Sequence, residues 1–375
     1  MSAPIVQGWC PGAHRPMTSG DGLVVRVRPR LARLEAQQVL GLCALAERFG
    51  NGTIDLTNRA NLQLRGVQEK DHRSLLVELA ELGLLDAEPG IEMRRNMLVT
   101  PLYKAHDRTA RLAQELIDRL GELPALPAKF GFAIDAGPQR LLASDSADIR
   151  LETGTDILIL RADGAETGKP VDESNAIDDL IALARWFSEH SSDEVRRMAQ
   201  VVARRDLPDI WQGVHPAPIG RPLQPGESAL GPLFGAAFGQ LPARALKELM
   251  EASDASALRV TPWRLFLLEG GAAISAPGFV TDGTDPILST DACAGAPLCP
   301  QAQVTTREIA RALATRVPGS LHVSGCVKGC ARKAPADITL VGQNGRFDLV
   351  KQGRAGDEPL QRGLTEKTLM TMEFT

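Results

Sequence analysis

Four of the six cysteines stand in two close pairs. Cys293 and Cys299 are separated by five residues, and Cys326 and Cys330 are separated by three. Thiolates are the usual ligands of iron-sulfur clusters, and four of them give each iron of a [4Fe-4S] cluster one protein ligand. Glycines and prolines lie within or beside both pairs, as expected of loops that wrap closely around a bulky inorganic group. The spacing therefore predicts that these four cysteines bind a [4Fe-4S] cluster.

Other states of the cysteines stay open from spacing alone. Structural zinc also takes four cysteines, but its paired ligands usually stand two to four residues apart, so the five-residue gap counts against zinc. Disulfides are disfavoured because the N-terminus lacks the pattern of a secretory signal, and cytoplasmic thiols stay reduced. Cys43 lies in an apolar helical pattern and is expected to be a buried free thiol. Cys10 is ambiguous between a buried thiol and a ligand.

Composition favours a soluble, cytoplasmic enzyme. Apolar residues make up 43% of the chain and charged residues 23%, and no apolar run approaches the roughly 20 residues of a membrane helix. The net charge of −4 argues against a general nucleic-acid binder, whose domain is normally basic. We therefore expect neither nucleic acid nor membrane as a partner.

The elements that must position the cysteines are repeated along the chain. Residues 54–67 overlay residues 258–271 without a gap, so that Thr57 meets Thr261 and Gly66 meets Gly270. Each copy follows a helix-like stretch, at residues 31–49 and 241–253. Residues 147–164 overlay residues 336–353, and both copies read as strand, turn, strand. The repeat predicts an α+β protein with pseudo-twofold symmetry, whose halves are joined by a Pro/Gly-rich linker at residues 208–232.

The cysteine pairs and the repeat resemble those of the siroheme-dependent nitrite and sulfite reductases. The resemblance implies a nitrite/sulfite reductase-like fold, in which a ferredoxin-like half-unit and a larger α+β unit each occur twice. Residues 1-85 would hold the N-terminal segment and the first half-unit, 86-207 the first larger unit, 208-280 the linker and second half-unit, and 281-375 the second larger unit with the cluster. In this family the last cysteine, here Cys330, also bridges to siroheme.

Three segments match motifs of the reductase active site. LTNRANLQLRGV resembles the segment that carries an active-site arginine, here Arg59, and RRNMLVTP resembles the segment that carries a second, here Arg95 followed by Asn96. LPAKFGF matches a strand on which the sulfite reductases present two lysines; Lys129 fits the first, but Gly131 replaces the second. The missing cation weakens the case for a sulfite substrate, because the reductases surround a small dianion with four cations.

The N-terminal run CPGAHRPMTSGDGLVVRVRP is similar to the precorrin-3B synthase branch of the same superfamily. This resemblance implies a monooxygenase of aerobic cobalamin biosynthesis that uses molecular oxygen to hydroxylate precorrin-3A, a tetrapyrrole, and close a γ-lactone. A mononuclear non-haem iron is a possible second cofactor, but the six histidines do not reveal its ligands. The chain has no nucleotide-binding motif, so electrons are expected from an external donor protein.

Precorrin-3A carries many carboxylate arms, which arginines bind well. We expect substrate contacts from Arg26, Arg28, Arg65 and Asn96, with Arg59, Arg95 and Lys129 in catalytic roles. Alternation would place Arg26, Arg28 and Arg30 on one face of a strand. The main alternative is a siroheme-dependent assimilatory sulfite or nitrite reductase. A more distant one is an electron carrier or a zinc-stabilised binding module.

Overall fold

The computed structural model describes residues 11–155 and 157–374, whose strands form four sheets. Two of the sheets build a central unit. The first has the order β1 (Met17–Ser19), β2 (Gly22–Val27), β5 (Leu62–Val67), β4 (Thr53–Leu56), β12 (Gln240–Pro242). The second has the order β11 (Leu233–Gly235), β14 (Leu265–Glu269), β13 (Ala257–Val260), β3 (Arg33–Glu35).

The two central sheets exchange one strand each. β12 comes from the second half of the chain but pairs with β4 of the first half, with Leu241 opposite Ile54. β3 comes from the first half but pairs with β13, with Leu34 opposite Leu258. The two ferredoxin-like half-units are therefore interlocked, and no boundary along the chain separates their sheets.

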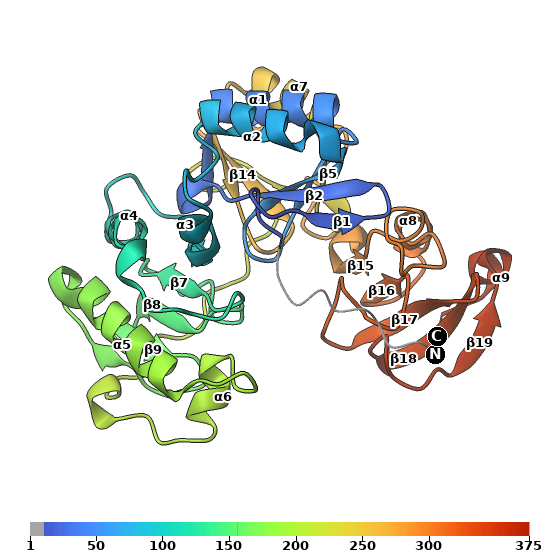
Figure 1. Ribbon diagram of the computed structural model, residues 1–375. Helices are drawn as coiled ribbons and strands as arrows, with labels where there is room; N and C mark the ends of the chain where they lie inside the picture. The colour runs from blue at the N-terminus through green and yellow to red at the C-terminus, as the bar shows by residue number, and fades with distance from the viewer. Residues whose placement is uncertain (1–10, 156, 375) are drawn as a thin grey trace.

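A left-handed residue precedes each exchanged strand. Leu31 (φ 52°) and Phe238 (φ 57°) turn the chain before β3 and β12. Each strand leads directly into a helix, α1 (Ala36–Phe49) or α7 (Ala243–Ser253), so the helix predicted at 31–49 begins later than expected. α1 and α7 lie side by side with α2 (His72–Glu81) above the central sheets (Figure 1), because their apolar residues recur at helical spacing.

The predicted repeat in the central unit is confirmed, both in its strands and in the turns between them. Residues 54–67 form β4 and β5, and residues 258–271 contain the matching β13 and β14. The Thr57 hydroxyl accepts hydrogen bonds from the backbone N–H groups of Arg59 and Asn61, and the Thr261 hydroxyl accepts the equivalent pair. Gly66 (φ 76°) and Gly270 (φ 70°) both adopt the left-handed conformation that glycine tolerates best.

The first larger unit holds the third sheet. Its strands β6, β7 and β8 run parallel, and β9 and β10 return antiparallel. They are β6 (Met97–Val99), β7 (Phe132–Asp135), β8 (Ile149–Thr153), β9 (Leu158–Ala162) and β10 (Lys169–Pro170). The helices of this part of the chain are α3 (Pro89–Arg94), α4 (Arg108–Asp118), α5 (Ala176–His190) and α6 (Met198–Val202).

The second larger unit repeats this topology in the fourth sheet. Its first three strands are again parallel and its last two antiparallel. They are β15 (Thr290–Ala292), β16 (Leu321–Ser324), β17 (Ala336–Gln343), β18 (Arg346–Gly353) and β19 (Gln361–Leu364), with α8 (Arg307–Leu313) and α9 (Glu366–Thr371). Asp148 and Asp337 occupy matching positions and accept matching hydrogen bonds, from the backbone N–H groups of Gly131 and Ser320.

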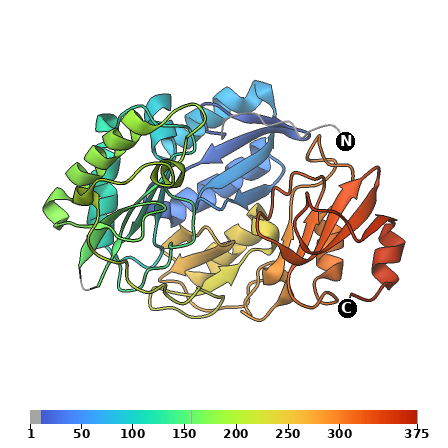
Figure 2. The same ribbon diagram turned by 90° about the horizontal axis from the view of Figure 1, so that it is seen from below.

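Three large apolar cores follow from this arrangement: one in the central unit and one in each larger unit. The larger units lie on opposite sides of the central unit, as the view from below shows (Figure 2). Residues 208–232 form the connection between the halves, with one 3₁₀ turn at Asp209–Trp211 and isolated bridges to the first larger unit. Every helix within the described ranges is too short or too polar to cross a membrane.

Candidate functional site

Two of the four paired cysteines follow neighbouring parallel strands. Cys293 comes directly after β15, and Cys326 comes shortly after β16. Because adjacent parallel strands end at the same edge of a sheet, both cysteines lie at one edge. The backbone N–H of Gly325 donates to the Cys293 sulfur at 3.2 Å, which ties the first pair to the second.

The remaining two cysteines lie in the loops of the same edge. The backbone N–H of Cys299 donates to Gly295 O at 2.8 Å and closes a helical turn back toward Cys293. Cys330 is exposed at the surface, but the protein that surrounds its thiol raises its pKa, and negative charge on Cys293 and Cys326 raises it further. Cys293 and Cys326 are thus among the groups whose charge acts on the Cys330 thiol.

Glycines let the backbone come close around the cysteines. A Cβ on Gly325 would lie 2.6 Å from Ala302 Cβ, and one on Gly295 would lie 2.5 Å from Thr306 Oγ1. Gly295 (φ 68°) and Gly329 (φ 57°) are also left-handed. Side chains at these positions would displace the loops that carry the thiols. The donor set and its glycine-lined loops fit a [4Fe-4S] cluster, with a cysteine available for each iron.

A single metal ion fits less well. Across residues 11–155 and 157–374, no three His, Cys, Asp or Glu side chains are close enough to hold one ion. Four thiolates around one zinc stand about 3.8 Å apart, as follows from tetrahedral geometry with Zn–S bonds of about 2.3 Å. Thiolates that each bind a different iron stand farther apart. The described side chains also leave the mononuclear iron of the sequence prediction without a ligand set.

The loop between Cys293 and Cys299 is held by the N-terminal hairpin. The carbonyl oxygen of Leu298 accepts three hydrogen bonds, from Ser19 Oγ at 2.7 Å, Gly20 N at 3.0 Å and an Arg65 guanidinium N–H at 3.2 Å. Arg65 is also paired with Asp21 at 3.2 Å. Arg65, expected to bind substrate, therefore holds the cysteine loop in this structure.

Arg59 and Lys129 lie together at the start of the first larger unit. The Arg59 guanidinium donates to Lys129 O at 3.2 Å and lies 3.5 Å from Ser146 Oγ. Asn96, next to them, donates to Phe130 O at 2.7 Å and fixes the segment that carries Lys129. Arg59 is partly buried and the Lys129 side chain is exposed, so both cations remain reachable from solvent.

Arg95, Arg28 and Arg26 are buried. Arg95 forms a buried ion pair with Asp86 at 2.7 Å and donates to Arg28 O at 2.7 Å, and Arg28 donates to Glu92 O. The expectation that Arg26, Arg28 and Arg30 share one strand face is wrong. β2 ends at Val27, and Arg30 already belongs to a 3₁₀ turn, because Pro29 cannot donate to a continuing ladder.

Gly131, which replaces the second lysine of the reductases, has no room for a side chain. A Cβ there would lie 2.9 Å from Asn96 Nδ2 and 3.0 Å from Asn96 O. Its backbone N–H donates to the buried carboxylate of Asp148 at 2.9 Å. A lysine could be accommodated only if Asn96 and the strand start moved.

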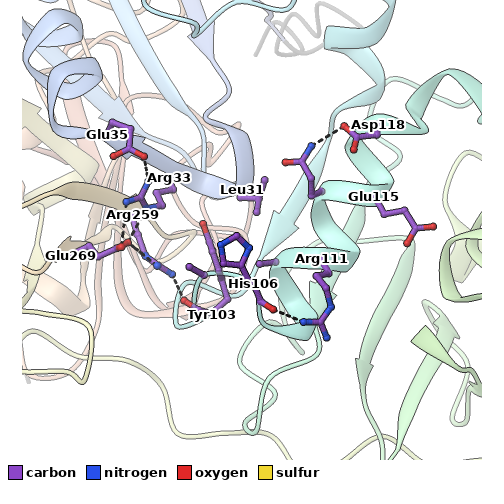
Figure 3. Close-up of a pocket in the computed structure, with 13 residues that line it drawn as sticks. Leu31, Arg33, Glu35, Tyr103, His106, Arg111, Glu115, Asp118, Arg259 and Glu269 are labelled. Carbon is purple, nitrogen blue, oxygen red and sulfur yellow. Dashed lines mark hydrogen bonds and ion pairs between the residues drawn. The ribbon is translucent and has the colours of Figure 1, made fainter. Parts of the chain in front are cut away.

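A pocket of about 710 Å³ lies between β3 and α4 and contains none of the predicted site residues (Figure 3). Arg259 forms one wall, where it pairs with Glu269 at 2.7 Å and lies over the Tyr103 ring at 4.1 Å. Arg33 pairs with Glu269 at 2.9 Å on the same wall, and His106 and Arg111 lie on the opposite side. Its arginines are paired with carboxylates or carbonyl oxygens of the pocket and its rim.

The pseudo-twofold symmetry explains this pocket. Its wall residues Arg33, Arg259 and Glu269 match Gln240, Asp55 and Arg65 of the other half by strand register. There the long connection at residues 293–306 contacts Arg65 through Leu298, and Arg307 pairs with Asp55 at 3.5 Å. The shorter connection at residues 100–107 leaves the matching space open. The pocket is therefore the space in the first half that corresponds to the cysteine loop of the second half.

Several features of the site were absent from the sequence predictions. Ser19 and Gly20 were not singled out, because their partner Leu298 is 279 residues away from Ser19 along the chain. Cys43 is buried as predicted, and burial raises its pKa to about 12. Cys10 lies outside the described residues.

Comparisons with known proteins agree with this architecture. Residues 15–82 match the nitrite/sulfite reductase ferredoxin-like half domain. The chain is 32% identical to a precorrin-3B synthase from Sinorhizobium sp., over 95% of this chain and 85% of that protein. It is 26% identical to a ferredoxin–nitrite reductase from Synechococcus elongatus, over 89% and 78% of the two chains.

A solved structure, that of the NirA protein of Mycobacterium tuberculosis, superposes with a TM-score of 0.67 over 93% of this chain and 79% of that one, at 17% identity. This likeness confirms the predicted nitrite/sulfite reductase-like α+β fold. Since the identity to the Sinorhizobium protein extends over almost the whole chain, the protein belongs to the precorrin-3B synthase family of the nitrite and sulfite reductase superfamily.

Proposed function

We propose that the protein is a cytoplasmic, oxygen-dependent monooxygenase that converts precorrin-3A to precorrin-3B. The observation that carries this proposal is the 32% identity to a precorrin-3B synthase over 95% of the chain. The reaction adds a hydroxyl group at a meso carbon of the tetrapyrrole and closes a γ-lactone. It consumes molecular oxygen and electrons from an external donor protein.

Cys293, Cys299, Cys326 and Cys330 would hold the [4Fe-4S] cluster. When bound, the cluster supplies single electrons, which molecular oxygen requires because it reacts slowly with closed-shell organic molecules. Support comes from the shared sheet edge of Cys293 and Cys326 and from the N–H···S hydrogen bond of Gly325. The chain's own contribution is to hold four thiols at the surface of the second larger unit, against the N-terminal hairpin.

Two cations are the best candidates for substrate contact. Arg59 and Lys129 are accessible and adjacent, so they are suited to pair with carboxylate arms of the tetrapyrrole. The more deeply buried arginines are better suited to support the site, since Arg95 and Arg65 already pair with aspartates. Asn96 would contribute indirectly, by fixing the backbone beside Lys129.

The alternative is a siroheme-dependent assimilatory reductase. The identity of 26% to a nitrite reductase favours it, but to a smaller degree than the identity to the synthase. The crowded site of Gly131 counts against it, because the second lysine of the sulfite reductases has no space there.

The decisive experiment supplies the substrate directly. Protein reconstituted anaerobically with iron and sulfide is incubated with precorrin-3A and a reductant. Labelled oxygen is then admitted, and the mass of the product is measured by mass spectrometry. We expect a product that carries one labelled oxygen atom in the new hydroxyl group. Tightly bound isobacteriochlorin with sulfite or nitrite reduction, and no oxidation of precorrin-3A, would establish the reductase instead. Zinc without iron and sulfide would point to a binding module.

A further inference from the structure

His322 lies in the middle of β16 and is completely buried. Neither of its ring nitrogens has a hydrogen-bond partner in the described part of the chain. An imidazole offers at least one N–H donor in either protonation state, so His322 has a hydrogen bond to give. Leaving a buried polar group without a partner destabilises a fold, so two such atoms on one ring call for a ligand.

The ring faces the loop that carries the second cysteine pair. Leu321 and Val323 point into the apolar core of the larger unit, so the alternation along β16 puts His322 and Ser324 on the other face. Ser324 Oγ donates to Cys326 O at 2.7 Å on that face. A Cβ built on Gly329 would lie 3.6 Å from His322 Cε1, the ring carbon bonded to both nitrogens.

The polar neighbours of His322 on the adjacent strands are already engaged. Asp291, opposite it on β15, pairs with Arg332 at 3.0 Å and with Arg264 at 3.3 Å. Thr339, opposite it on β17, donates its hydroxyl to Gly353 O at 2.8 Å. Beside these neighbours, the ring also faces the segment from Cys326 to Cys330, which approaches it through Gly329.

We propose that His322 is a positioning residue that donates a hydrogen bond from its imidazole N–H to a sulfur of the cluster, either a cysteine thiolate of the 326–330 loop or an inorganic sulfide. This inference rests on the cluster of the proposed function. Hydrogen bonds to cluster sulfurs stabilise the reduced, more negative state, and they are one of the factors that set cluster reduction potentials. His322 thus raises the potential at which the cluster accepts an electron.

The test is a potentiometric titration of the reconstituted full-length protein, followed by electron paramagnetic resonance. His322→Leu removes the donor and is expected to shift the cluster potential downward. His322→Gln keeps an N–H donor and is expected to recover part of the shift. Thr339→Val is the matched control. It removes a buried hydroxyl of the neighbouring strand that donates to Gly353 O and not toward the cysteines. The cluster potential of this variant should equal that of the unchanged protein.

A second readout separates a direct contact from a general disturbance. In protein labelled with ¹⁵N-histidine, pulsed electron paramagnetic resonance of the reduced cluster should show a coupling to histidine nitrogen, and His322→Leu should lose it. A normal cluster with no coupling and an unchanged potential in His322→Leu would overturn the role of His322 and leave the cluster intact. Unchanged protein that binds no iron and sulfide would overturn both proposals.

Discussion

Just before β7, the backbone N–H of Gly131 donates to the buried Asp148 carboxylate, and a Cβ on Gly131 would lie 2.9 Å from Asn96 Nδ2. The glycine lets the strand start pack against Asn96, and it leaves out a cation that the sulfite reductases carry. Arg95, for which a catalytic role is predicted, is buried and paired with Asp86. At the residue scale, burial and partners distinguish accessible cations from those that support the fold.

Introducing lysine in place of Gly131 should destabilise the fold. In Gly131→Lys, the new Cβ would lie within 3.0 Å of Asn96 atoms, and overpacking of this kind costs about 1–3 kcal/mol. Denaturant unfolding measures the loss. The matched control is Gly121→Lys, where a Cβ meets nothing within 4 Å. Equal midpoints for the two variants would show that the site of Gly131 is not crowded.

Loss of one predicted ligand should abolish the cluster. Cys326→Ser replaces a thiolate that iron binds well by a hydroxyl that it binds poorly, so the brown colour, the bound iron and sulfide, and turnover should all be lost. Cys43→Ala removes a buried thiol of α1 and should leave the iron content unchanged. A normal cluster in Cys326→Ser would remove this residue from the ligand set.

Asp135 on β7 should make stability depend on pH. Burial raises its pKa to about 6, so the folded protein keeps a proton that the unfolded chain loses, and stability falls as pH rises from about 4 to 6. Asp135→Asn has no charge to bury. Its stability relative to the unchanged protein should therefore rise by about 1 kcal/mol between pH 5 and pH 8 in denaturant titrations.

The exposed Asp282 provides the comparison for this effect. Hydrogen bonds from Thr284 lower the pKa of Asp282, so its carboxylate form stabilises the fold at neutral pH. Both the folded and the unfolded forms of Asp282 are ionised above pH 5, so the stability of Asp282→Asn relative to the unchanged protein should stay constant between pH 5 and pH 8. An equal rise with pH in both variants would refute the burial argument for Asp135.

At the scale of elements, the hairpin of β1 and β2 links the N-terminal part of the chain to the loop between Cys293 and Cys299. Ser19, Gly20 and Arg65 all donate to Leu298 O, between Cys293 and Cys299. The first ferredoxin-like half-unit therefore holds the loop that the second larger unit needs for its thiols. Coupling of this kind predicts that changes in the hairpin affect the cluster without touching a cysteine.

Gly20→Ala tests that coupling. Its Cβ would meet Pro297 O closer than real Cβ atoms come to any atom, so either the hairpin or the cysteine loop must shift. We expect faster loss of iron to a chelator, followed by the decay of visible absorbance. Gly90→Ala, where nothing lies within 4 Å of the new Cβ, should lose iron at the normal rate. Equal rates would mean that the hairpin does not restrain the loop.

At the scale of the whole molecule, the exchange of β3 and β12 makes each half depend on the other. The first half alone would lack the strand that pairs with β4 and the helix α7 that packs against α1. Its exposed apolar residues would then favour aggregation.

Cutting the chain without removing either half tests this dependence. Residues 1–221 and 222–375, divided in the exposed linker, should each be insoluble alone but copurify as a folded pair when coexpressed. Copurification and the near-ultraviolet circular dichroism of the pair measure the result. A soluble, cooperatively unfolding fragment 1–221 would show that the halves fold independently.

Much of this architecture could be predicted from the sequence. The repeats were detectable because Thr57 and Thr261, and Gly66 and Gly270, perform the same local roles in their turns. The strand exchange was not detectable, because β3 and β12 have three residues each and their partners lie about 190 residues or more away. A strand of three residues is too short to show a clear alternation of apolar and polar residues. That alternation would in any case not identify the pairing partner.

The site could be predicted only in part. Cysteine spacing predicts a four-thiol site, which stays a prediction, whereas the contact of Arg65 with Leu298 depends on tertiary packing. His322 was not singled out because an alternating strand suggests a solvent-facing residue at its position. Its face is instead covered by the loop that follows its own strand. Whether such a residue is buried depends on the path of the loop, and the alternation of residues along a strand does not reveal that path.

The interlocked sheets also constrain how the chain arose. If a single half were an independent protein, two identical copies could satisfy the same strand pairings by each lending β3 or its equivalent to the other, as in a domain-swapped homodimer. Such an ancestor would have carried two equal sites. Fusion of two gene copies frees each half to diverge, so that one keeps the thiols while the other retains only the open space beside Tyr103.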